Sequence, residues 1–479
     1  MNRFGLLWTT AAAALVLGSC ARNPVTGQRE LVLVSESQEI AMGQQAAQEA
    51  AASIGLVDDA DLQQYVSRIG MTMARESQRP NLPWSFQVVD DPSPNAFALP
   101  GGFIFVTRGL LTMMNDEAEL ATVLGHEIGH VTARHGVQQM SRAQLAQIGL
   151  VAGSILSPQI AEMSGLASQG LQLLFLRYGR DAEYQADDLG FEYALNDNYD
   201  VRAFASTFTS LARASQLAGA SPLPAWLSTH PYPEDRIARN QQRVAGLDRS
   251  LEGTVRRPIE FLAQIDGLVY GSDPRQGFFR DNLFHHPDLR FRIAFPDGWR
   301  RQNMTHAVVA MSPQEDAMIQ LTIAGNAAPG DALRAFLSQE GIQPGQAGTQ
   351  TLNGNPAAVG TFQAQAEGGV LQGIVAMVQH GGNTYQVIGY SPAQRYSAYS
   401  NTFQQSLGSF RVETDQAVLG VQPDRMHIVR LPSAMTLAQF NARYPSTISM
   451  EELALVNQVE GPGSTMPAGT MAKQVRRTQ

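Results

Sequence analysis

The chain has 479 residues, enough for about two to four domains, and its hydrophobic fraction of 44% is ample for packed cores. The formal net charge is −9, 16% of the residues are charged, and no run of like charge occurs. A nucleic-acid-binding surface needs clustered Lys and Arg, so this composition argues against nucleic acid as a partner.

The N-terminus resembles a targeting segment. Leu6–Leu17 is apolar or small, and it has the length of a signal-peptide core but is too short to span a bilayer. The stretch ends at Leu17-Gly18-Ser19-Cys20, which resembles a bacterial lipobox, and Cys20 is the only cysteine of the chain. We therefore expect residues 1–19 to be a signal peptide and Cys20 to carry a lipid. The alternative is an ordinary signal peptide with an incidental cysteine.

Helix and strand signals follow the anchor. Residues 20–34 are expected to form the lipid anchor and a tether that leads into a short strand, Leu31–Val34. Hydrophobic repeats of three and four residues predict helices, and alternation predicts strands. In chain order these are helices over 36–56 and 60–76 and strands over Trp84–Val89 and Phe103–Val106.

The next helix carries two histidines. Asn115 is the expected N-cap, and the helix is expected to run to about Arg134. It contains His126-Glu127-Ile128-Gly129-His130. Residues four apart share one helix face, so both imidazoles can ligate one metal, and Glu127 can reach a water molecule there. The alternative is a pair of solvated histidines, but the apolar neighbours predict a buried helix, where unpartnered histidines are costly.

A third metal ligand is expected further along the chain. Residues 143–176 are interpreted as buried helices or a lid, and helices are predicted over 181–195 and 201–218. The first of these two helices places Glu183 and Asp187 on one face. Catalytic zinc usually takes three protein ligands, so we assign Glu183 to the metal, with His126 and His130, and Asp187 to the free N–H of His126. His135 is expected to face elsewhere and to be structural.

These residues resemble a known family. Gly125–Val131, His135 and Glu183–Asp187 are similar to the motifs of the CAAX prenyl protease and HtpX family of gluzincin metallopeptidases. Three further stretches resemble its bacterial periplasmic branch: Asn23-Pro24-Val25-Thr26-Gly27 with Ser35-Glu36, Asn95 to Gly102, and Ser228-Thr229-His230-Pro231 with Arg236. The resemblance covers about residues 22–245. The helical-repeat domain of the best-known periplasmic relative has no counterpart here, so client recognition is not carried over.

The resemblance implies zinc-dependent proteolysis with one Zn²⁺ per chain, and this branch is associated with outer-membrane protein quality control. Glu127 is then the general base. A substrate strand would pair with Asn95, Ala96, Phe97 and Ala98 through backbone hydrogen bonds. His230 or Arg236 would stabilise the tetrahedral oxyanion, or His230 would take the fourth metal position and close the site. The remaining alternative for His230 is packing in a proline-rich loop.

The composition changes after about residue 255. Strand signals over 280–412, with helices at 331–340 and 393–407, predict an α+β domain that loosely resembles the sandwich of Mog1- and PsbP-like proteins. Its His285-His286 pair is interpreted as part of a surface loop. Residues 425–476 resemble a divergent LysM module, which would bind glycans such as peptidoglycan. The equal alternative is that residues 425–476 have the LysM fold but do not bind glycan.

The predicted fold class is α+β multidomain, with a mainly helical zincin-type metallopeptidase domain over 35–255, a small edge sheet, the α+β sandwich and the LysM-like module. The predicted function is a zinc-dependent endopeptidase that hydrolyses peptide bonds of misfolded or stalled envelope proteins, and the expected partners are unfolded or misassembled envelope proteins as substrates. The expected location is the periplasm, lipid-anchored in the inner leaflet of the outer membrane, because Ala21 stands where Asp favours inner-membrane retention. Two alternatives stay open: a zinc-binding chaperone or scaffold, and a hydrolase of cell-wall peptides.

Overall fold

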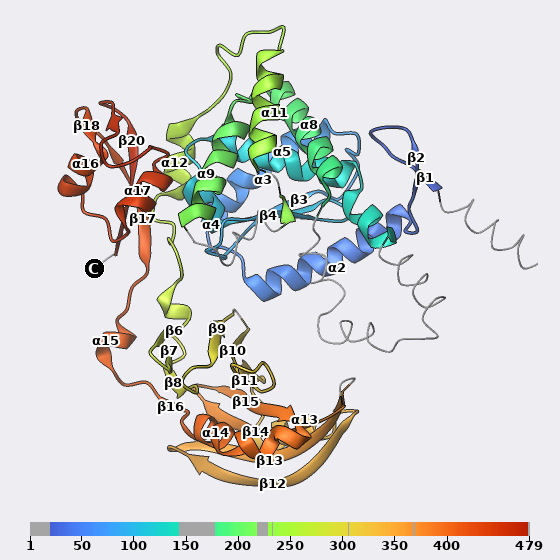
Figure 1. Ribbon diagram of the computed structural model, residues 1–479, viewed down its shortest axis with the longest axis vertical. Coiled ribbons are helices and arrows are strands. Elements are labelled where there is room, and N and C mark those ends of the chain that lie inside the picture. Colours follow the sequence, from blue (N-terminus) through green and yellow to red (C-terminus); the bar gives the residue numbers. More distant parts are fainter. Residues whose placement is uncertain are drawn as a thin grey trace, which may run out of the picture. The chain divides into compact units, whose positions relative to one another are not determined.

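The computed structural model describes residues 20–142, 178–217, 229–231, 233–304, 306–366 and 369–477. They form two compact units (Figure 1). The described residues of the first unit run from Cys20 to Ser272 and resume at Asp424, and those of the second run from Asp273 to Pro423. The expected signal peptide and the helices predicted over 143–176 lie outside the described residues. No described helix is long and apolar enough to cross a membrane.

Two helices and a small sheet open the first unit. Ser35 and Gln38 form a reciprocal cap at the start of α2 (Glu36–Ile54), and Asp59 caps α3 (Ala60–Arg75). The sheet has the order β3-β5-β4, from β3 (Ser85–Val89), β5 (Phe103–Thr107) and β4 (Ala96–Leu99). β4 pairs antiparallel with β5 and is an edge strand of this sheet. Figure 1 shows α2 on one side of the sheet and α5 and α8 on the other.

The central helix of this unit is α5 (Glu117–Thr132), which follows the short helix α4 (Arg108–Met113). Every residue of α5 is buried. Its N-cap is Asp116, whose carboxylate accepts the backbone N–H of Glu119, so the prediction of Asn115 as the cap is wrong. The backbone N–H of Asn115 instead donates to the Glu119 carboxylate, 2.7 Å away. Glu119 thus donates its backbone N–H to Asp116 and accepts the backbone N–H of Asn115, and both hydrogen bonds stabilise the start of α5.

Helix α5 packs against α8 (Arg180–Asn196) at backbone distance, because glycines line the contact. A Cβ atom on Gly190 would lie 2.6 Å from the backbone nitrogen of His126. A Cβ atom on Gly129 would lie 2.9 Å from the carbonyl oxygen of Ala186. These glycines set the separation of the two helices. The remaining helices of this part are α9 (Ala203–Leu217), α11 (Pro233–Ala245) and α12 (Pro258–Ile265).

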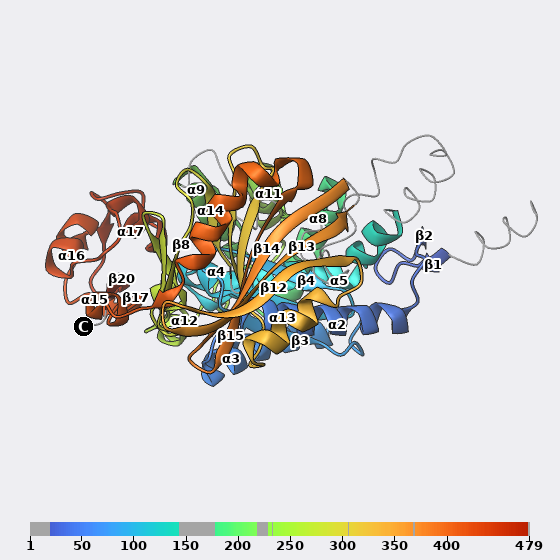
Figure 2. The same cartoon turned by 90° about the horizontal axis from the view of Figure 1, so that it is seen from below.

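The end of the chain forms a β-α-α-β module that belongs to the first unit. Its main elements are β17 (Asp424–Arg430), α16 (Leu437–Arg443), α17 (Met450–Val456) and β20 (Met471–Arg477), and β17 pairs antiparallel with β20. Met426, Leu455 and Val475 share one hydrophobic cluster with residues of α3, α5 and α9. Figures 1 and 2 both show the module beside α12. The sequence predicted that residues 425–476 form a separate small unit. Instead, Met426, Leu455 and Val475 pack into the core of the unit that holds α5.

The second unit contains a seven-stranded antiparallel sheet with the order β12-β13-β14-β15-β11-β10-β9. Alternate residues of β14 (Gly369–His380) face opposite sides of it. Ile374, Ala376 and Val378 pack with residues of α14 (Tyr396–Gly408), and Val375 and Met377 pack with residues of α13 (Pro329–Leu337). The other strands are β9 (Arg300–Asn303), β10 (Ala307–Met311), β11 (Met318–Ile323), β12 (Ile342–Leu352), β13 (Asn355–Ala366) and β15 (Asn383–Pro392).

A four-stranded sheet completes the second unit, with the order β16-β8-β7-β6. Its strands are β6 (Phe278–Arg280), β7 (Leu283–His286), β8 (Phe291–Ala294) and β16 (Arg411–Val412). The predicted surface loop at His285-His286 is wrong, because both residues lie on β7 and His285 is 3% exposed. The Nδ1 atom of His285 lies 2.5 Å from the carboxylate of Glu413, so the buried imidazole is paired within the fold.

Candidate metal centre

Three histidines and a glutamate converge where α5, α8 and the residues before α11 meet. The ligand atoms of His126, His130, Glu183 and His230 all lie within 4.8 Å of one another, and the four side chains are buried. His126 Nε2 lies 3.0 Å from His130 Nε2 and 3.2 Å from His230 Nδ1. Glu183 Oε1 lies 3.5 Å from His130 Nε2 and 3.1 Å from His230 Nδ1. Imidazole nitrogens and a carboxylate oxygen at this spacing fit a zinc ion.

Asp187 and Arg236 contact two side chains of the cluster, His126 and Glu183. Asp187 Oδ1 lies 2.9 Å from His126 Nδ1, and a carboxylate in this position fixes the tautomer of a ligand histidine. The fully buried guanidinium of Arg236 donates to Asp187 at 2.6 and 2.7 Å and lies 2.8 Å from Glu183 Oε2. The ring of Phe208 covers it at 4.3 Å. Arg236 therefore connects two carboxylates of the site, a contact that the sequence did not predict.

The other nitrogen of His130 contacts His135. The two Nδ1 atoms lie 2.9 Å apart, and His135 Nε2 lies 2.9 Å from Gln185 Oε1. The expectation that His135 faces elsewhere assumed a continuous helix. That expectation is wrong, because α5 ends at Thr132 and Arg134 adopts a left-handed φ of 60°, which turns the chain back. Tyr178 stacks on His130 with 4.0 Å between ring centroids.

Glu127 is buried beside the four ligands. Among the described residues, neither of its carboxylate oxygens has a hydrogen-bond partner, and Oε1 lies 3.5 Å from His230 Nε2. Burial raises the pKa of Glu127, although His230 and His126 oppose the shift. Burying a carboxylate that accepts no hydrogen bond is costly, so the position of Glu127 beside the cluster is typical of a residue that transfers a proton.

Burial and neighbouring charges set the protonation of the ligands. Burial and the nearby His126 lower the pKa of His130 well below its usual range. Burial would by itself raise the pKa of Glu183, but His230 and Arg236 outweigh it and hold that pKa well below its usual range. Neutral imidazole and ionised carboxylate are the forms that bind a metal, so the fold favours the binding forms of both side chains.

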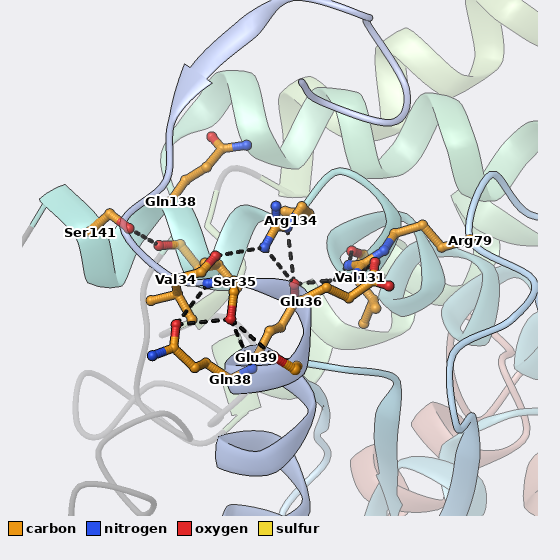
Figure 3. Close-up of polar contacts among 12 residues, drawn as sticks. Val34, Ser35, Glu36, Gln38, Glu39, Arg79, Val131, Arg134, Gln138 and Ser141 are labelled. Carbon is orange, nitrogen blue, oxygen red and sulfur yellow. Dashed lines mark hydrogen bonds and ion pairs between the residues drawn. The ribbon is translucent and has the colours of Figure 1, made fainter. Parts of the chain in front are cut away.

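A buried ion network braces the C-terminal end of α5 (Figure 3). Glu39 of α2 lies 2.7 Å from Arg79 and 2.8 Å from Arg134. Arg79 also donates to the carbonyl oxygen of Val131 at 3.1 Å and lies 2.9 Å from Glu36. Cations at this end satisfy carbonyls that lack helical partners and complement the helix dipole. The network fixes α2 to the end of the helix that carries His126 and His130.

The N-terminal residues form a hairpin on the same end of α5. β1 (Cys20–Arg22) pairs antiparallel with β2 (Arg29–Leu31), which is earlier and shorter than the strand predicted over Leu31–Val34. Between them, the Asn23 amide donates to Glu30 at 2.9 Å and to the carbonyl oxygen of Ala133 at 3.2 Å. The expected tether is thus a folded segment whose position relative to α5 is set by hydrogen bonds.

The residues predicted to bind substrate lie at the edge strand β4. Ala96, Phe97 and Ala98 belong to the strand, and Asn95 comes directly before it. Ala98 lines a small cavity together with His130 and Tyr178, so the strand lies next to the cluster. The structure therefore brings this edge, the four ligand side chains and Glu127 into one site.

At the site, a buried helix with the sequence His-Glu-x-x-His meets a second helix that contributes the carboxylate of Glu183. Residues 60–244 match the model of Peptidase family M48. One relative is a "Putative beta-barrel assembly-enhancing protease" of Vibrio cholerae, 32% identical over 197 residues that cover 40% of each chain. Another is the "Mitochondrial metalloendopeptidase OMA1" of Schizosaccharomyces pombe, 33% identical over 46% of this chain and 65% of the relative.

The chain spans between 40% and 65% of the length of these two relatives. Among solved structures, the solution structure of cyanobacterial PsbP from Synechocystis matches 28% of this chain and 94% of its own, at 14% identity and a TM-score of 0.24. A TM-score of 0.24 does not establish a shared fold, so the PsbP-like sandwich stays a prediction.

Proposed function

We propose that this protein is a zinc-dependent endopeptidase, and the observation that carries the proposal is the buried Glu127 beside the cluster, whose carboxylate has no hydrogen-bond partner among the described residues. His126, His130 and Glu183 would hold one Zn²⁺. When bound, zinc acts as a Lewis acid that lowers the pKa of a water ligand and polarises the scissile carbonyl. The Glu127 carboxylate takes a proton from the attacking water and delivers it to the leaving amine nitrogen as the peptide C–N bond breaks.

Two further residues keep the ligands in place. Asp187 accepts the Nδ1–H of His126, so the Nε2 lone pair of His126 is directed at the metal position. Arg236 neutralises part of the charge of Glu183 and Asp187, and both partners hold its guanidinium. We therefore propose Arg236 as a positioning residue in preference to an oxyanion donor.

His230 is proposed as a fourth ligand in the resting state. Its Nδ1 lies within 3.2 Å of both His126 Nε2 and Glu183 Oε1, inside the group of ligand atoms. In that position it closes the site to water, and it must move before a substrate is cleaved. The alternative is that His230 donates a hydrogen bond to the oxyanion once substrate has entered.

The substrate is proposed to bind as an extended strand along β4. Backbone groups of Asn95, Ala96, Phe97 and Ala98 would pair with it, which selects an unfolded segment with free backbone donors and acceptors. The relative named as a beta-barrel assembly-enhancing protease supports envelope proteins as the substrate class. Cys20 as a lipid anchor in the outer membrane and 425–476 as a glycan-binding module are part of the same proposal.

A cleavage assay on two substrates tests the proposal. We expect the zinc-loaded full chain to cut a permanently unfolded protein, to leave its native form intact, and to lose activity when a chelator removes the metal. Release of peptides from purified cell wall would favour the wall hydrolase. Binding of unfolded protein without cleavage would favour the zinc-binding chaperone.

A further inference from the structure

The C-terminal module contacts the segment where the metal-bearing helix begins. Lys473 of β20 is 0% exposed, and its Nζ donates to the carbonyl oxygens of Thr112 at 2.9 Å and Met114 at 2.5 Å. These carbonyls lie at the C-terminal end of α4, where helical partners are missing. A buried ammonium is stable only with such acceptors, so Lys473 satisfies the end of α4 and is held by it.

A second side chain of the module reaches the same segment. The Gln458 amide donates to the carbonyl oxygen of Met113 at 3.1 Å and to Glu119 Oε2 at 2.9 Å. Gln458 has a left-handed φ of 52°, which directs this part of the module toward α5. Glu119 is buried in the first turn of α5 and also accepts from the hydroxyl of Ser206 at 2.7 Å.

The charges that face Lys473 come from α5 and its cap. Glu119 and Asp116 act on the ammonium electrostatically, and Arg256 lies 2.7 Å from Asp116. The two carboxylates offset part of the cost of burying the Lys473 ammonium. The module therefore supplies hydrogen-bond donors to a segment that carries acceptors.

The position of this segment is transmitted to the ligands by a rigid helix. Glu119 precedes His126 by about two helical turns, and every residue between them is buried. Gly190 and Gly129 bring the backbones of α5 and α8 into close contact beside His126. A shift at the start of α5 therefore changes the distance between His126 on α5 and Glu183 on α8.

We propose that Lys473 and Gln458 are positioning residues for the metal centre, and that the C-terminal module is a structural clamp on the start of α5. The inference rests on the proposed function only where activity is measured, because metal binding is tested separately. It predicts that the module contributes to metal affinity although none of its residues contacts the ligand cluster. A chain that ends at Ser272 would then keep all the proposed metal ligands but would bind zinc more weakly.

Full-length Lys473→Met tests the clamp, since methionine keeps the apolar stem and removes the donors. Arg476→Met is the matched control, because Arg476 is exposed on the same strand. We expect Lys473→Met to weaken Zn²⁺ binding, measured by competition with a chelator, on the order of tenfold, as for residues that support metal ligands. Hydrogen exchange of the α5 amides should accelerate. The control should match the wild type in both measurements.

Gln458→Asn provides a second variant that preserves folding, because asparagine tolerates a left-handed φ but is too short to reach Met113 and Glu119. We expect weaker zinc binding, a lower kcat and an unchanged KM, since the β4 edge is untouched. Folded variants with wild-type zinc affinity and wild-type exchange in α5 would overturn the proposal. So would a loss of thermal stability with unchanged zinc affinity. A wild type that binds zinc but cleaves nothing would refute the proposed function and leave the clamp standing.

Discussion

Replacing Gly190 by alanine perturbs the contact that sets the distance between the two ligand-bearing helices. The added Cβ would lie 2.6 Å from the backbone nitrogen of His126, and ordinary contact begins at 3.4 Å, so α5 and α8 must separate by roughly 0.8 Å. The obstacle is backbone, which cannot rotate away. Overpacking of this kind costs about 1–3 kcal/mol of folding free energy.

The displacement acts directly on the metal site, since His126 and His130 lie on one helix and Glu183 lies on the other. We expect Gly190→Ala to weaken Zn²⁺ binding by about 10–100-fold, as when supporting residues are removed. The assay is competition with a chelator, combined with urea unfolding. Gly179→Ala is the control, because a Cβ there meets no atom of the described part of the chain within 4 Å. Equal zinc affinity in Gly190→Ala and the wild type would refute the claim that this contact positions the ligands.

Three further predictions follow from individual residues. His230→Ala should raise basal peptidase activity because it opens the fourth ligand position, whereas a loss of kcat worth about 3–4 kcal/mol would assign the oxyanion role instead. Burial, opposed by Glu119 and Asp116, lowers the pKa of Lys473 to about 7, while its unfolded value stays near 10.5. The unfolded chain then binds more protons above pH 7, so urea unfolding should show wild-type stability rising relative to Lys473→Met between about pH 7 and 10; a pH-independent difference would contradict the lowered pKa of the buried lysine. Cys20→Ser should release the protein from the membrane fraction, and unchanged fractionation would mean that Cys20 is not the anchor.

The parts of the site that depend on local spacing could be predicted from the sequence. His126 and His130 share one helix face, as do Glu183 and Asp187, because four-residue spacing determines facing within any helix. The same reasoning failed for His135, where α5 ends and Arg134 reverses the chain. Periodicity carries no information about where a helix stops unless a cap is recognised.

Contacts between distant parts of the chain were not predictable from spacing. Arg236 joins Glu183 and Asp187 across 49 or more positions, and Lys473 reaches Met114 across 359. Arg236 was singled out by the motif that contains His230, but its two carboxylate partners were not predicted, and Lys473 is indistinguishable in sequence from a solvated lysine. Lys473 lies on β20 beside Val475, which belongs to the same hydrophobic cluster as residues of α5, and this long-range packing is not encoded in local spacing. For the same reason 425–476 was expected to be a separate module.

The most direct test of the account is the Glu127→Gln variant. In the proposed mechanism Glu127 moves a proton and does not bind metal, and it lies outside the group of four residues that could hold a metal ion. The account predicts that Glu127→Gln retains about one zinc per chain while cleavage of an unfolded protein falls by about 10²–10⁴-fold, the usual contribution of a general base. A variant with normal zinc content and wild-type cleavage would contradict it.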